Sequence, residues 1–197
     1  MAMTLQQILD EIQEKYPHGF SNDSIIRKIN QIQAELFRTI YRPITQTFYD
    51  LLADNPYYPL DFSSSKVVDV VVNGCEYPFR HVKGKDLSKY YYFTDDQTLA
   101  IFPTPTEDIT DGLMVVHYKE PRTLTTSDLS LAPDFDPDYH MLLVYLVCKQ
   151  LAENAKEYDV ANGFAVQANQ MLQSFEQGTE TPDFTTIQDV YGGCLLL

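Results

Sequence analysis

Apolar residues recur every three or four positions in two stretches near the N-terminus, which is the period of an amphipathic helix. Thr4 and Gln7 form a capping box that predicts a helix start at Leu5, and Pro17 ends that helix. Ser21 is placed to cap a second helix that stops before Pro43. The two apolar stripes comprise Leu5, Ile8, Leu9, Ile12 and Tyr16, and then Ile25, Ile26, Ile29, Ile32, Leu36, Phe37 and Ile40.

The pattern changes to that of β-strands from residue 44 to residue 137, where Pro and Gly recur between β-branched and aromatic runs. Residues 66–72 followed by Asn73-Gly74 predict a hairpin, and residues 89–94 and 98–103 predict a second hairpin around 95–97. We expect another strand at 113–120, after a turn at Asp111-Gly112. Residues 44–52 fit a strand or one helical face, and their Thr-rich composition favours the strand.

Two further helices are predicted at about 138–158 and 159–177, with Pro137 in the first turn of one and Gly178 ending the other. The sequence therefore predicts an α+β fold in three parts. Residues 1–43 and 138–177 form one helical bundle with two N-terminal and two C-terminal helices. Residues 44–137 form an inserted antiparallel β region that projects from the bundle, and residues 178–197 form an extended C-terminal arm.

The charge of the chain excludes some functions. The formal net charge is −14, and residues 44–137 carry fifteen acidic and seven basic side chains. Proteins that grip nucleic acid do so with Lys and Arg, so phosphate binding is disfavoured, although DNA could still slide past such a surface. The N-terminus has no signal-peptide pattern and no apolar run approaches 18 residues, so we expect no membrane association.

No motif of a known enzyme class is present, and we predict no catalytic, metal or cofactor site. Three cysteines without a CxxC spacing disfavour a zinc site. His140 lies near Asp136 and Asp138, but acidic residues are expected at a helix start without any metal. His18 and His81 are expected in loops, and His117 is expected on the surface of a strand.

The run Tyr90-Tyr91-Tyr92-Phe93 allows two interpretations. It could be an exposed platform on which a sugar or a base stacks. Alternate residues of a strand face opposite sides, so the run equally fits a strand that is covered on both faces. We favour the covered strand.

The order of the segments is more informative than any single motif. Two N-terminal helices precede an aromatic β region, a Pro-rich loop and paired C-terminal helices. The β region and the loop after it also contain a pattern of spaced apolar residues and prolines. Its members are Leu99, Pro103, Pro105, Val116, Tyr118, Pro121 and Leu124. This arrangement, over residues 4–177, resembles the head-to-tail adaptor (connector) proteins of tailed bacteriophages.

The resemblance implies a structural virion protein, made in the cytoplasm of the bacterial host and located in the neck between head and tail. It implies a ring of about twelve copies under the portal protein. Such a ring extends the DNA channel for genome ejection, without sequence-specific DNA binding, and tail or further neck proteins attach below it.

The resemblance also implies that the C-terminal segment inserts between portal subunits. The apolar residues of this portal-binding arm are Phe184, Ile187, Val190, Tyr191, Leu195, Leu196 and Leu197. The stripe of the third helix is wider than one partner helix can cover, so it needs a second contact, either inside the subunit or with a neighbouring subunit. The second alternative predicts a subunit interface at this stripe. Its residues are Met141, Val144, Tyr145 and Cys148.

Two other classes of protein remain open on the sequence alone. One is a carbohydrate- or ligand-binding β module that uses the aromatic run 90–93 as its platform. The other is a hydrolase that uses His140 or paired carboxylates such as Asp95-Asp96 and Glu107-Asp108. The first requires an exposed aromatic strip, and the second requires a cleft with perturbed titratable groups.

Overall fold

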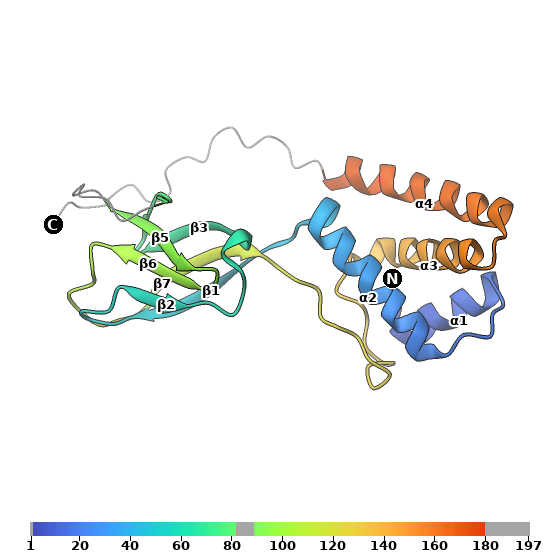
Figure 1. Ribbon diagram of the computed structural model, residues 1–197, viewed down its shortest axis with the longest axis horizontal. Coiled ribbons are helices and arrows are strands. Elements are labelled where there is room, and N and C mark those ends of the chain that lie inside the picture. Colours follow the sequence, from blue (N-terminus) through green and yellow to red (C-terminus); the bar gives the residue numbers. More distant parts are fainter. Residues whose placement is uncertain (1, 82–88, 180–197) are drawn as a thin grey trace. The chain divides into compact units, whose positions relative to one another are not determined.

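The computed structural model describes residues 2–81 and 89–179 and has an α+β fold, as predicted (Figure 1). The described residues divide into two compact units. A helical unit contains residues 2–42 and 120–179, and a β unit contains residues 43–81 and 89–119. Each unit has its own buried apolar core.

The four helices of the helical unit are α1 (Leu5–Lys15), α2 (Asn22–Leu36), α3 (His140–Asn154) and α4 (Tyr158–Thr179). A π-helical turn, Phe37–Tyr41, follows α2, and a 3-10 turn, Pro137–Tyr139, precedes α3. The predicted capping box is present, because Thr4 Oγ1 accepts from the Gln7 N–H at 3.3 Å and Gln7 Oε1 accepts from the Thr4 N–H at 2.9 Å. Ser21 caps α2 as predicted.

The last helix does not end where the sequence suggested. Gly178 was expected to stop it, but α4 continues to Thr179. A glycine inside a helix costs about 1 kcal/mol relative to alanine and does not by itself terminate the helix. The third helix also begins slightly later than expected, because the 3-10 turn occupies residues 137–139.

Helix α3 lies between α1 and α4 within the helical unit (Figure 1). Its residues Leu142, Leu143, Val147 and Leu151 are fully buried. They pack with the apolar stripes of α1 and α2 and with Ala168 and Phe175 of α4 in one continuous core. Helix α3 is apolar on most sides because it is covered by helices on more than one side.

The segment from residue 120 to residue 136 packs with the helices, although its lack of helical period had placed it with the β region. The Leu5 and Gln6 N–H groups lie in the first turn of α1 and have no acceptor within the helix. They donate instead to Leu131 O at 2.7 Å and Leu129 O at 3.0 Å. The Asn30 side chain exchanges two hydrogen bonds with the backbone of Leu124, at 2.8 and 2.9 Å. The segment therefore satisfies polar groups of α1 and α2.

The β unit contains two antiparallel sheets. One has the strand order β1-β7-β3-β4 and the other the order β2-β6-β5. Both predicted hairpins and the strand at 44–52 are confirmed. The strands are β1 (Ile44–Leu51), β2 (Tyr57–Pro59), β3 (Val67–Val72), β4 (Cys75–Glu76), β5 (Tyr90–Asp95), β6 (Thr98–Phe102) and β7 (Ile109–Tyr118), and a 3-10 turn (Ser64–Lys66) precedes β3.

The turn expected at Asp111-Gly112 lies inside β7 as a bulge. Leu51 pairs with Ile109 while Tyr49 pairs with Leu113, so β7 has extra residues opposite β1. Asp111 has φ 53°, and its N–H donates to Asp50 Oδ1 at 2.9 Å. The residue types that favour a turn also permit the left-handed backbone of a bulge, which explains the wrong prediction.

His117 is buried, which corrects the expectation of a surface histidine. Its ring stacks on Phe62 with 3.7 Å between ring centroids. Nδ1 lies 3.2 Å from the carbonyl oxygen of Tyr118, and Nε2 lies 2.9 Å from Thr47 Oγ1. Both ring nitrogens are therefore used inside the β unit.

Candidate docking site

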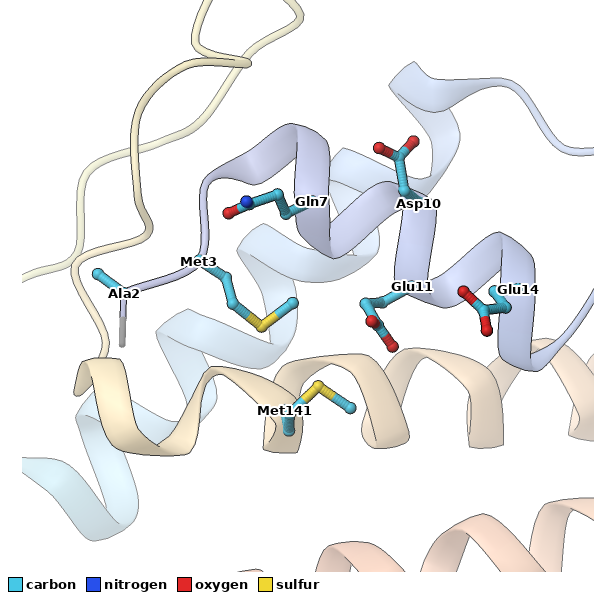
Figure 2. Close-up of a pocket in the computed structure, with 7 residues that line it drawn as sticks. All are labelled: Ala2, Met3, Gln7, Asp10, Glu11, Glu14 and Met141. Carbon is cyan, nitrogen blue, oxygen red and sulfur yellow. The ribbon is translucent and has the colours of Figure 1, made fainter.

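A hollow in the described part of the helical unit lies between α1 and the start of α3. It has a volume of about 420 Å³ and is lined by Ala2, Met3, Gln7, Asp10, Glu11, Glu14 and Met141. Figure 2 shows the thioether ends of Met3 and Met141 in the space between the two helices, with the carboxylate of Glu11 next to them and that of Glu14 farther along α1. We call this hollow the α1–α3 groove; it combines an apolar floor with an acidic edge.

His140 fixes the N-terminal side of the groove. Its Nδ1 accepts a hydrogen bond from the Met3 N–H at 3.0 Å, and its Nε2 lies 3.0 Å from Phe135 O. A carbonyl oxygen can only accept, so Nε2 donates to Phe135 O while Nδ1 accepts from Met3. His140 is 1% exposed. His140 therefore fixes the position of the Met3 backbone. Both of its ring nitrogens are engaged in hydrogen bonds, so neither offers a lone pair to a metal ion.

The carboxylates along α1 are placed by the helical spacing of the sequence. Glu11 pairs with Lys15 at 3.7 Å, and Asp10 accepts from Gln6 Nε2 at 2.8 Å. The Asp10 carboxylate points away from α3, whereas those of Glu11 and Glu14 lie next to the groove (Figure 2). The groove is thus suited to a partner that offers apolar atoms and hydrogen-bond donors together.

The residues proposed for the subunit interface lie at different depths. Val144 and Cys148 are fully buried in the core of the helical unit. Burial raises the pKa of the Cys148 thiol to about 12, so this group stays protonated at neutral pH. Met141 and Tyr145 are half-buried, and Met141 forms part of the groove floor. These two keep surface that a neighbouring molecule can reach.

The outward face of α4 is a second feature, which the sequence analysis missed. Residues 160–175 contain no Asp, Glu, Lys, Arg or His. Ala161, Ala168 and Phe175 face the core, and Gly163, Val166, Gln170 and Gln173 are exposed at helical spacing on the opposite side. We call these four residues the α4 outer face. The signal that could have revealed it was the long uncharged run, unusual in so acidic a chain.

The groups considered for enzymatic chemistry have structural roles. Asp96 accepts from the hydroxyls of Ser63 at 2.7 Å and Ser64 at 3.1 Å, and these hydrogen bonds lower its pKa. Asp108 accepts from the Ala53 N–H at 2.7 Å. Within residues 2–81 and 89–179, no three His, Cys, Asp or Glu side chains gather to hold a metal ion.

The aromatic run of β5 is not an open platform. Tyr90, Tyr91 and Tyr92 are all buried, as expected for a strand covered on both faces. Tyr91 packs in the main core of the β unit, while Tyr90 and Tyr92 pack with Ala100 and Phe102. This burial is evidence against the carbohydrate-binding interpretation, which required the rings to be exposed.

The predicted portal-binding residues Phe184, Ile187, Val190, Tyr191 and Leu195 to Leu197 lie outside the described part of the chain. Within the described part, no helix is both long and apolar enough to cross a membrane.

In the sequence, two helices precede the strands of the β unit and two helices follow them, and all four helices belong to one helical unit. The family model of the SU10 adaptor protein matches residues 3–188, and the chain belongs to this family of phage head–tail adaptors. The family is structural and not enzymatic. No curated protein matched the chain.

Proposed function

We propose that this phage adaptor forms a ring beneath the portal protein, extends the DNA channel and joins the head to the tail. The observation that carries the proposal is the family match over residues 3–188. The ring would contain about twelve copies, as the resemblance to head-to-tail adaptors implies. A closed ring of one chain requires a repeated head-to-tail contact. Tail or further neck proteins would bind on the side away from the portal, so the protein would reside in the neck of the virion.

The charge of the chain supports a channel that does not retain DNA. The net charge is −14, and like charges along a lumen repel phosphates. A protein that had to grip DNA would need the opposite balance. We therefore propose that the double helix passes through the ring without sequence-specific binding.

The C-terminal arm is proposed to hold the portal. Its seven apolar side chains, named above, can gain free energy by burial against another protein, at the cost of ordering the arm. The net gain for one copy is small because the two terms oppose each other. Attachment would then depend on many copies binding together in the ring.

Deletion of residues 180–197 tests this proposal. The deletion leaves α4 intact to Thr179, so we expect a folded protein with an unchanged melting temperature that no longer co-sediments with the portal. A matched control keeps the length of the arm and replaces its seven apolar residues with serine. Portal binding retained together with a large fall in melting temperature would contradict the proposal, because the arm would then be part of the subunit core.

A further inference from the structure

We infer that the α4 outer face of one copy binds in the α1–α3 groove of the next copy. This inference rests on the ring proposed above and names the two surfaces that make its repeated contact. A ring built from one chain needs two different surfaces that fit each other. Helix α3 lies between α1 and α4, so the groove and the α4 outer face are separate surfaces of the same helical unit (Figure 1).

The chemistry of the two surfaces is complementary. Gln170 and Gln173 carry side-chain N–H₂ donors, and the groove presents the carboxylates of Glu11 and Glu14 as acceptors. Val166 is 53% exposed and would cover the apolar floor. Because the α4 outer face carries no charge, it can approach an acidic groove without the repulsion that two copies of a −14 chain would otherwise meet.

The dimensions also agree. Helix α1 has 11 residues and is therefore about 16 Å long. The stripe from Gly163 to Gln173 covers about 15 Å of α4. A Cβ atom added at Gly163 would meet nothing within 4 Å inside the subunit, so the core gives no reason for a glycine there. A glycine on an exposed helix face lets a second helix approach closely.

The acidic groove by itself would suit a basic partner equally well. The α4 outer face favours a second copy as the occupant. This face is exposed in the single chain although it lacks charge. Exposed helix faces normally carry charge, and α1 and α2 do so at Glu14 and Arg27. Depletion of charge is typical of surfaces that another protein covers.

Charge changes on the two surfaces test the contact. The full chain is expressed with the portal, and the number of copies in each assembly is measured by native mass spectrometry and sedimentation over a range of concentrations. Val166→Glu and Gln170→Glu should each weaken assembly at least tenfold, whereas Gln170→Lys should strengthen it. The double variant Gln170→Glu with Glu14→Lys should restore assembly, because the charges are then exchanged across the contact.

Two matched controls lie on the exposed side of α2: Ala34→Glu for Val166→Glu, and Gln31→Lys for Gln170→Lys. Neither should alter assembly, and all variants should keep the melting temperature of the unmodified monomer.

If rings form and Gln170→Glu and Gln170→Lys assemble alike, the inferred contact is wrong while the ring remains. If Val166→Glu and Gln170→Glu abolish binding of tail or portal protein but leave the ring intact, the occupant is that protein and not a second copy. If the unmodified chain forms no ring with the portal, the proposed function itself is overturned.

Discussion

The helical unit and the β unit differ in how they use polar and charged side chains. In the β unit, carboxylates organise turns and bulges: Asp50 accepts from the Asp111 N–H, and Asp96 accepts from two serine hydroxyls. In the helical unit, one whole helix face from Gly163 to Gln173 has no charge. The acidity of the chain therefore has a local structural role in the β unit, while its absence from the α4 outer face has no explanation within a single subunit.

The largest effect is expected from a charge placed in the core of the helical unit. Val144 is fully buried on α3, so Val144→Glu should cost more than about 4 kcal/mol, since the carboxylate would have no partner. Hydrogen exchange should show loss of protection in α1, α3 and α4, with the β5–β6 hairpin still protected. The control is Val166→Glu, at an exposed position of α4. A Val144→Glu protein with unchanged protection throughout would show that α3 is not the centre of this core.

The second prediction concerns close packing in the β unit. A Cβ atom at Gly112 would lie 2.7 Å from Leu51 Cδ1 and 3.0 Å from Ile109 Cβ. Gly112→Ala should therefore lower the free energy of unfolding by about 1–3 kcal/mol, as overpacking does elsewhere. Urea unfolding measures the loss, and hydrogen exchange should locate it in β1 and β7. Equal stability of the two proteins would mean that Leu51 moves aside without cost.

Much of the fold could be predicted because local rules determine it. Thr4 and Ser21 cap their helices as expected, and the Asn73-Gly74 turn joins β3 to β4. These features depend on residues that are close in the sequence. The separation of the strands into two sheets could not be predicted, because antiparallel partners such as β1 and β7 are far apart in the chain.

The wrong prediction for His117 and the two surfaces that the sequence did not reveal have related causes. His117 sits in a strand where alternation permits either face, and only the position of Phe62 and Thr47 decides that its ring is buried. The groove needs α1 and α3 side by side, so Met3 and Met141 could not be associated from their spacing. The uncharged run of α4 was present in the sequence, but its meaning depends on knowing which of its positions are exposed.

A smaller effect is expected at the start of α1, next to the groove. Thr4 Oγ1 accepts from the Gln7 N–H, and Thr4→Ala removes that acceptor. The loss should lower the free energy of unfolding by about 1 kcal/mol, measured by urea unfolding. Thr4→Ser keeps the oxygen and should behave like the unmodified protein. Equal losses in both variants would indicate that the methyl group of Thr4, and not its hydroxyl, stabilises this end of α1.

The smallest effect should be a gain in the free energy of unfolding, whereas the same type of substitution in the β unit should cause a loss. Gly163→Ala is the same substitution as Gly112→Ala, but the added Cβ at residue 163 meets no atom within 4 Å and the residue lies inside a helix. Alanine restricts the unfolded chain and favours the helix, so the single subunit should gain about 0.5–1 kcal/mol of stability. Urea unfolding at a concentration where the protein is monomeric measures this gain.

If α4 meets a second helix closely at residue 163, the same variant should assemble more weakly, because the added methyl group holds the two helices apart. A variant that is more stable and assembles as well as the unmodified chain would show that no neighbouring backbone approaches Gly163, and would remove one of the arguments for the inferred contact.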